Sequence, residues 1–192
     1  MMNAHIAIVG GGASGLMAAA AAAESGARVL LLERMDRVGK KLLATGNGRC
    51  NLTHVRLAPE NYHGAPAEFI RAVLDQCPLN RTLDLFEKMG LSWRIEADSG
   101  RIYPRSAQAS SVLDVLRRAC ARLGVTEICG TGITRIERDS EGFTLKGKDG
   151  SALTAQKVIL ATGGRAAPGL GSNGSGYELA RQAGHRIVPP FP

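Results

Sequence analysis

Residues 8–15 read IVGGGASG, and Gly10, Gly12 and Gly15 within them have the spacing G-x-G-x-x-G. The first glycine of this pattern permits a tight turn, the second lets backbone approach a pyrophosphate, and the third lets a helix pack closely on a strand. A helix that begins near Ala13-Ser14 would offer free N–H groups and its positive dipole end to the phosphates. The stretch therefore predicts a phosphate-binding turn.

The residues around this turn predict a β-α-β unit. His5–Val9 is a short apolar run, Ser14–Ser25 is an Ala-rich helix, and Arg28–Leu32 is a second apolar strand. Glu33 ends that strand, 18 residues after Gly15, where a carboxylate can accept hydrogen bonds from an adenosine ribose and disfavours a 2′-phosphate. A glycine-rich turn beside an unrelated surface glutamate would need all of these features to coincide. The combination predicts dinucleotide binding.

The rest of the chain predicts further helices and strands around this unit. Helices are expected at Pro66–Gln76, Leu79–Met89, Val112–Leu123 and Tyr177–Gln182, with a hairpin of Trp93–Ile95 and Arg101–Tyr103. A β-meander is expected from Ile133–Arg138, Phe143–Lys146 and Leu153–Leu160, which short Gly-containing turns separate. Between Glu33 and Thr53 the chain is polar and glycine-rich, with at most one helical turn at Lys40–Ala44, and loops of this length are usually functional.

The composition excludes several classes of protein. Of the 192 residues, 44% are hydrophobic and 21% are charged, as in an ordinary globular domain. The net charge of +7 favours anionic partners, but the cations are scattered and only 4% of residues are aromatic, so nucleic-acid binding is not expected. Residues 6–23 carry no charge, yet four glycines, weakly apolar alanines and the absence of preceding basic residues argue against a membrane span or a signal peptide.

The cysteine and histidine patterns predict no metal site, and no residue is assigned a catalytic role. The four cysteines form no C-x-x-C pair, which fits a reducing, cytoplasmic compartment. The four histidines have no ligand spacing. A P-loop motif is absent, and Ser14 lacks the glycine two residues later that a nucleophile elbow needs.

The segment after Glu33 separates the possible cofactors. Residues 39–51 read GKKLLATGNGRCN, residues 103–106 read YPRS, residues 161–164 read ATGG, and residues 176–180 read GYELA. In this order, and with the glycine turn and the meander, they resemble the FAD-binding enzymes grouped with aminoacetone oxidase and the bacterial dehydro-bile-acid reductase (BaiN type). That group is related to flavoproteins with a glutathione-reductase-like FAD domain. The resemblance covers essentially the whole chain, and GNGRCN is its most specific part.

Carried over residue by residue, the resemblance implies an FAD site. The pyrophosphate would be held by Gly10, Gly12, Ala13, Ser14 and Gly15, and the adenosine would be framed by Glu33 and Arg34. The segment that would pass near the phosphates or the flavin contains Lys41, Gly46, Asn47, Gly48, Arg49, Cys50 and Asn51. The backbone of Ile133 would contact the adenine, and the site would be closed by Thr162, Gly163 and Gly164. Lys41 has the alternative of a solvated helix face, and Cys50 that of a small packed hydrophobic residue.

The expected fold is α/β, a glutathione-reductase-like Rossmann FAD/NAD(P)-binding domain over residues 1–192, with a three-layer βαβ core and the β-meander packed on one face. The resemblance implies an FAD-dependent oxidoreductase that acts by hydride transfer at a bound flavin on a small organic substrate. NAD(P)H is a candidate electron donor.

Two departures from the family pattern open an alternative. Residues 174–176 are Gly-Ser-Gly where many flavoproteins of the wider superfamily have Gly-Asp-Gly. Family members are also about twice as long, with a substrate-side domain and a C-terminal return segment that contacts the flavin. The alternative is therefore a non-catalytic, partial dinucleotide-binding module that needs the missing segment. An NAD-only Rossmann protein is disfavoured by the GNGRCN loop and the meander.

Overall fold

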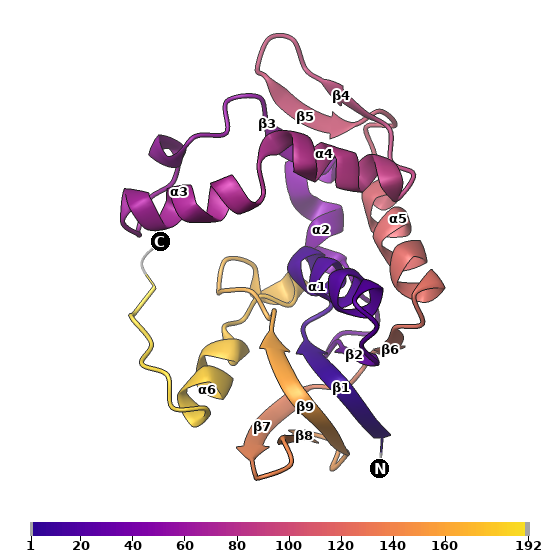
Figure 1. Cartoon of the computed structure of the whole chain (residues 1–192), viewed down its shortest axis with the longest axis vertical. Helices are drawn as coiled ribbons and strands as arrows, with labels where there is room; N and C mark the ends of the chain where they lie inside the picture. Colours follow the sequence, from indigo (N-terminus) through magenta and orange to yellow (C-terminus); the bar gives the residue numbers. More distant parts are fainter. Residues whose placement is uncertain (1, 191–192) are drawn as a thin grey trace. The chain divides into compact units, whose positions relative to one another are not determined.

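The computed structural model describes residues 2–190, which form two compact units. The first unit runs up to Leu42 and resumes at Leu116, and the second comprises Leu43–Val115. Figure 1 labels the helices and strands of both. In sequence, the second unit is an insertion into the first.

The predicted β-α-β unit is confirmed. β1 (Met2–Val9), α1 (Ala13–Glu24) and β2 (Val29–Leu32) follow one another, and β1 pairs in parallel with β2. All four residues of β2 are buried, as expected for a parallel strand that is covered on both faces. The helix ends at a turn in which the Gly26 N–H donates to the Ala23 carbonyl at 2.9 Å.

A six-stranded sheet with the order β6-β2-β1-β9-β8-β7 forms the centre of the first unit. β7 (Ile133–Arg138), β8 (Phe143–Gly147) and β9 (Ala152–Leu160) are the predicted meander, and β9 also runs parallel to β1. β6 (Thr126–Ile128) pairs in parallel with β2. The sequence does not predict β6, because three residues are too few to show a period.

The meander is joined to the parallel strands through β9 and packs across one face of them. One apolar cluster contains Ile133, Ile136 and Leu145 of the meander, Ala7, Val9, Leu30 and Leu32 of β1 and β2, and Leu179 of α6 (Ser175–Gln182). The opposite face presents the fully buried Ile8 and Leu31. Helix α1 covers that face, so the expected three-layer arrangement is confirmed.

The second unit combines helices with a small antiparallel sheet. It contains α3 (Ala67–Gln76), α4 (Leu79–Lys88) and a sheet with the order β3-β5-β4, formed by β3 (Thr53–His54), β4 (Trp93–Ile95) and β5 (Arg101–Pro104). The predicted hairpin and both predicted helices are confirmed, whereas β3 is an addition. Two short 3-10 helices, η1 (Thr45–Gly48) and η2 (Pro59–Asn61), belong to this unit, and η3 (Pro168–Leu170) belongs to the first. The boundary between the two units falls within α2 (Lys40–Ala44).

Helix α5 (Ala109–Arg122) is the predicted helix that follows the hairpin. Its last turns belong to the first unit, where the Cys120 thiol donates to the Leu16 carbonyl of α1 at 3.4 Å. Although α5 has 14 residues, neither it nor any other helix within residues 2–190 is long and apolar enough to cross a membrane.

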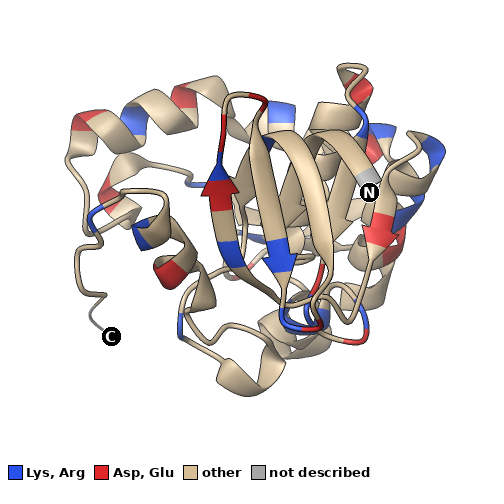
Figure 2. Ribbon diagram, turned by 90° about the horizontal axis from the view of Figure 1, so that it is seen from below, with Lys and Arg blue, Asp and Glu red and all other residues tan. Residues whose placement is uncertain are grey.

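Charged residues are spread over many elements (Figure 2). In the meander, Arg135 and Lys146 both pair with Glu137, each at 2.9 Å. Arg117 of α5 pairs with Glu127 of β6 at 3.0 Å. Each of these three cations is therefore paired with a glutamate of the same unit, and the three do not form a continuous basic stripe.

Candidate functional site

The three glycines of the turn between β1 and α1 differ in how closely the surrounding chain approaches them. A Cβ on Gly15 would overlap the carbonyl oxygen of Gly10, and a Cβ on Gly10 would overlap the carbonyl oxygen of Ala161, which follows β9. Gly10 also has a φ of 112°, which side chains other than glycine rarely adopt. By contrast, a Cβ on Gly12 would have no atom within 4 Å. Two glycines are thus required by packing, and the third faces open space.

The first turn of α1 leaves its backbone donors available. Gly12 is the N-cap residue, no side chain caps this end of the helix, and the first turn contains no acidic residue. Ala13 and Ser14, the next two residues, are exposed. Because the first N–H groups of a helix have no partner within it, this end can bind an anion.

Glu33 connects the glycine turn to the chain that follows β2. One carboxylate oxygen, Oε2, accepts a hydrogen bond from the Gly11 N–H at 2.8 Å, and the other, Oε1, accepts one from the Met35 N–H at 2.8 Å. A carboxylate has about four lone-pair sites, so two remain for donors such as ribose hydroxyls. The carboxylate is held in place without a ligand.

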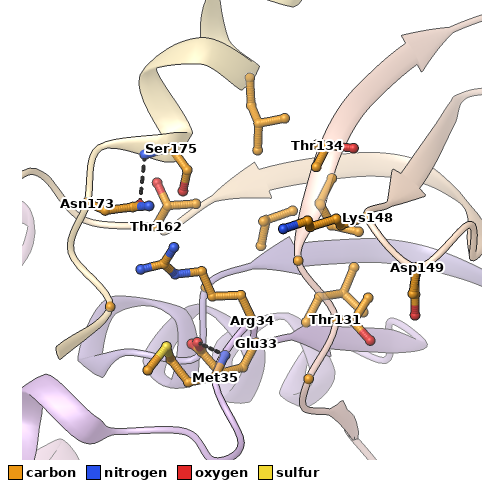
Figure 3. A pocket seen from close by; sticks show the side chains of 18 of the residues that line it. Glu33, Arg34, Met35, Thr131, Thr134, Lys148, Asp149, Thr162, Asn173 and Ser175 are labelled. Atoms are coloured by element: carbon orange, nitrogen blue, oxygen red, sulfur yellow. Dashed lines mark hydrogen bonds between the residues drawn. The ribbon is translucent and has the colours of Figure 1, made fainter. Parts of the chain in front are cut away.

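A cavity of about 770 Å³ lies in the first unit beside this turn. Its lining comes from the ends of β1 and β2, the segment before β7, the turn between β8 and β9, and the loop before α6: Val9, Gly10, Leu32, Glu33, Arg34, Met35, Gly130, Thr131, Gly132, Ile133, Thr134, Lys148, Asp149, Thr162, Pro168, Gly171, Asn173, Ser175 and Leu179. Figure 3 shows its polar side chains. The volume lies within the range of small-molecule and cofactor sites.

Five residues predicted from the sequence line this cavity, namely Gly10, Glu33, Arg34, Ile133 and Thr162. The Nε atom of Arg34 is buried and has no hydrogen-bond partner within residues 2–190. Such a group costs free energy unless a ligand or water satisfies it. The open space at Gly12, the uncapped helix end and this nitrogen together fit the adenosine and pyrophosphate part of a dinucleotide.

The sequence did not indicate several polar residues of the lining. Thr131, Thr134, Lys148 and Asp149 come from the meander and the residues before it. Only the turn at Lys148-Asp149-Gly150 was visible as a pattern, and a turn motif does not say which way its side chains point. The other predicted residues of this unit are absent from the lining, namely Gly12, Ala13, Ser14, Gly15, Lys41, Gly163 and Gly164.

Asn173 explains how α6 begins without the expected carboxylate. Its Oδ1 atom accepts a hydrogen bond from the Ser175 N–H at 3.1 Å, drawn as a dashed line in Figure 3. Gly174 between them has a φ of 80°. Asn173, two residues before the position of the expected aspartate, thus orients the turn.

The GNGRCN segment belongs to the second unit and has an unusual backbone. Gly46, Asn47, Gly48 and Cys50 all have positive φ values, of 56°, 54°, 80° and 58°. For asparagine, and more so for cysteine, this conformation is strained and persists only where surrounding contacts enforce it. The segment is therefore held by interactions outside itself.

Arg49 supplies these interactions through its side chain. Its Nη1 atom donates to Glu96 Oε1 at 3.1 Å, its Nη2 atom donates to the Tyr103 hydroxyl at 3.3 Å, and its guanidinium carbon lies 4.3 Å from the centre of the Tyr103 ring. Asn51 Nδ2 donates to the carbonyls of Thr53 and Ile102, at 3.0 and 3.1 Å. In this unit Arg49 and Asn51 act as anchors of the segment. Their contact with a flavin stays a prediction.

Two pKa shifts accompany this arrangement. A hydrogen bond from the Ser99 hydroxyl, followed by one from Arg49, holds the pKa of Glu96 below its usual value. Burial raises the pKa of the Cys50 thiol, so Cys50 stays a neutral thiol at physiological pH. This property fits the packed-residue interpretation of Cys50.

Within residues 2–190 no group of three or more His, Cys, Asp or Glu side chains could hold a metal ion. The four cysteines are free.

Comparison with known proteins relates this fold to a family. The model of the HI0933-like protein Rossmann domain matches residues 4–190. A 3-dehydro-bile acid delta(4,6)-reductase from Clostridium scindens is 46% identical over 189 residues, which are 97% of this chain and 46% of that protein. A ribosomal RNA dihydrouridine synthase from Escherichia coli is 32% identical over 182 residues, 95% of this chain and 45% of that protein. The chain spans about half the length of the curated relatives it matches.

Among solved structures, a 3-ketosteroid-delta4-(5alpha)-dehydrogenase from Rhodococcus jostii aligns with a TM-score of 0.65. It is 20% identical, and the alignment covers 84% of this chain and 46% of that one. At this identity the match supports the fold alone.

Proposed function

We propose that this chain, which belongs to the HI0933-like Rossmann domain family, binds FAD and is the cofactor-binding part of a flavin-dependent oxidoreductase. The adenosine and pyrophosphate of FAD would occupy the cavity beside the glycine turn. The substrate would be a small organic molecule, and NAD(P)H is the candidate electron donor.

The observation that carries this proposal is the contrast among the three glycines. Gly10 and Gly15 are required by backbone packing, but the absence of a side chain at Gly12 has no packing reason within the described chain. The space in front of Gly12 adjoins the uncapped start of α1, where a pyrophosphate would meet both backbone N–H groups and the helix dipole. A ligand that uses this space accounts for the glycine.

The remaining residues have roles that follow from their positions. Glu33 would accept hydrogen bonds from the ribose with the lone pairs that Gly11 and Met35 leave unused. Arg34 would place its unpartnered Nε beside the ligand. The buried side chain of Leu179 and the backbone of Ile133 would border the adenine. When bound, FAD supplies the capacity to accept or donate a hydride, and these groups bind and orient it.

The names of the relatives support redox chemistry but differ in substrate. One is named for a bile acid and another for ribosomal RNA. A base in RNA is therefore an alternative candidate to the small-molecule substrate proposed for this chain, and activity assays should test both kinds of substrate.

The test is the visible absorption spectrum and the mass of the purified protein, before and after FAD is added. We expect a flavin band at about 450 nm that stays with the protein on gel filtration. Gly12→Val should abolish it, because the side chain would fill the pyrophosphate position. The matched control is Gly169→Val, since Gly169 also has open space at its Cβ and no positive φ. Retention of flavin by Gly12→Val would contradict the proposed site.

A colourless protein would favour the alternative function, a partial dinucleotide-binding module. That chain would bind adenine dinucleotides weakly and need the further length that its relatives have. Adding the corresponding C-terminal half of a relative in trans would then be expected to restore flavin binding.

A further inference from the structure

Two cations face the cavity of the first unit from different elements. Arg34 follows β2, and Lys148 lies on the turn between β8 and β9. Both line the 770 Å³ cavity. Figure 3 shows the Arg34 guanidinium and the Lys148 amine turned into it.

Neither cation has a hydrogen-bond or ion-pair partner among the described residues. This distinguishes them from Arg117, Arg135 and Lys146 of the same unit, each of which pairs with a glutamate at 2.9 to 3.0 Å. The Arg34 Nε atom is in addition fully buried. The lining contains two cations and two carboxylates, Glu33 and Asp149, but neither cation forms an ion pair within residues 2–190.

The two acidic residues of the lining are engaged elsewhere. Glu33 accepts from the backbone of Gly11 and Met35. Asp149 Oδ1 accepts from the Ser151 N–H at 3.0 Å and from the Ser151 hydroxyl at 2.6 Å. Neither carboxylate pairs with a cation of the cavity, so both cations are available to a ligand.

The turn that carries Lys148 is fixed by its own hydrogen bonds. The Lys148 N–H donates to the Gly132 carbonyl at 2.8 Å, and the Gly147 N–H donates to the Ser151 carbonyl at 2.8 Å. The first bond ties the turn to residues that themselves line the cavity. The side chain of Lys148 is thus exposed, while its backbone is fixed at the edge of the cavity by hydrogen bonds.

Because Arg34 and Lys148 have no ion-pair partner within residues 2–190, an anion that reaches both would gain two ionic contacts without breaking an existing one. Phosphate is the natural choice, because arginine binds it in a planar fork and lysine as a point charge. We propose that Lys148 is a further ligand-binding residue of this cavity and that it pairs, opposite Arg34, with phosphate oxygens of the adenine dinucleotide. This inference rests on the proposed function.

The experiment separates phosphate recognition from recognition of the nucleoside. ADP and adenosine are titrated calorimetrically into the wild-type chain, Lys148→Gln, Lys148→Arg and Lys146→Gln at low ionic strength, and FAD binding is followed by fluorescence. Lys146→Gln is the matched control, since Lys146 lies on neighbouring β8 and pairs with Glu137 outside the cavity.

We expect Lys148→Gln to weaken the binding of ADP and FAD about tenfold and to leave the binding of adenosine unchanged. Lys148→Arg and Lys146→Gln should bind like the wild type, and the tenfold loss should shrink in high salt.

The outcomes distinguish this inference from the proposed function. If the wild-type chain binds ADP and FAD and Lys148→Gln binds them equally well, Lys148 is excluded and the proposed function stands. An equal loss for ADP and adenosine would also overturn phosphate pairing. If the wild-type chain binds neither ADP nor FAD, the proposed function fails and this inference fails with it.

Discussion

The glycine turn of the first unit and the GNGRCN segment of the second are both rich in glycine, yet they are built on different principles. In the turn, Gly10 and Gly15 are required by backbone atoms that lie within the β-α-β unit or at the end of β9. In the segment, four positive φ values between Gly46 and Cys50 depend on side chains 47 and 54 residues away, Glu96 and Tyr103. The first region is specified by close backbone packing and the second by an anchored arginine.

The difference teaches which substitutions each region tolerates. A turn set by backbone contact should fail when any atom is added at the wrong glycine. A segment set by side-chain anchors should loosen gradually as the anchors are removed. The predictions that follow, from the largest expected effect to the smallest, test this distinction.

Gly15→Ala should have the largest effect. Alanine normally stabilises a helix by about 1 kcal/mol relative to glycine, but here its Cβ would overlap the Gly10 carbonyl. We expect a loss of about 3 kcal/mol or more in the free energy of unfolding, measured by urea denaturation. Gly12→Ala is the control and should leave stability nearly unchanged. A stable Gly15→Ala protein would show that backbone packing does not specify the turn.

Glu33→Ala should cost about 1 to 3 kcal/mol of stability, because the N–H groups of Gly11 and Met35 would lose their acceptor. FAD affinity should fall by a similar amount through the lost ribose contacts. Glu33→Gln should be intermediate in both, since an amide has one acceptor oxygen for two donors. Urea denaturation and FAD titration measure the two effects. An amide variant as stable as the wild type would mean that one of the two bonds is unimportant.

Glu96→Gln should loosen the GNGRCN segment without unfolding the unit. Hydrogen exchange of residues 46–51 should become a few-fold faster, because Arg49 loses its ionic partner. Glu87→Gln, an exposed substitution in the same unit, is the control. No change in exchange would show that the segment holds its strained backbone without Arg49.

The ion pair between Arg49 and Glu96 predicts that stability depends on pH. The pKa of Glu96 is lowered in the folded protein, so its contribution is fully present above the unfolded carboxyl pKa of about 4.3 and is lost as the pH falls through the lower folded value. The difference in Tm between wild type and Glu96→Gln should therefore be constant near neutral pH and vanish in acid. A difference that grows in acid would assign the shift to another group.

Tyr103→Phe should have the smallest effect. The hydroxyl that accepts from Arg49 at 3.3 Å is lost, while the ring that lies 4.3 Å from the guanidinium remains. We expect a loss of about 0.5 kcal/mol in urea denaturation. Tyr103→Leu, which removes the ring as well, should cost clearly more. Equal losses would mean that the ring contributes nothing to the anchor.

Most elements of this fold could be predicted because their patterns are local. The turn at Gly10–Gly15, Glu33 at the end of β2 and the meander all follow from spacing within short stretches. The sequence could mark GNGRCN as special through its resemblance, but it could not identify Glu96 and Tyr103 as its anchors. Those contacts depend on how β5 pairs with β3 and β4. The alternation of apolar and polar residues along a strand does not predict which strands pair.

The cavity lining was predicted only in part for the same reason. Lys148 and Asn173 line the same cavity as Gly10. Their common location depends on the order of the strands, in which β9 lies beside β1, and the alternation within one strand does not predict that order. Their residue types gave no signal either, since lysine and asparagine are ordinary turn residues.

The two hydrogen bonds of Glu33 also have a kinetic consequence. Because the carboxylate already joins the glycine turn to Met35 in the chain after β2, the proposed ribose acceptor does not have to be ordered when a ligand arrives. A site of this kind binds with little rearrangement, so variants that leave Glu33 intact should change the dissociation rate far more than the association rate. In Glu33→Ala the association rate itself should fall, because the ligand must then wait for the turn to adopt its binding shape. Stopped-flow measurements of FAD binding would separate the two rates.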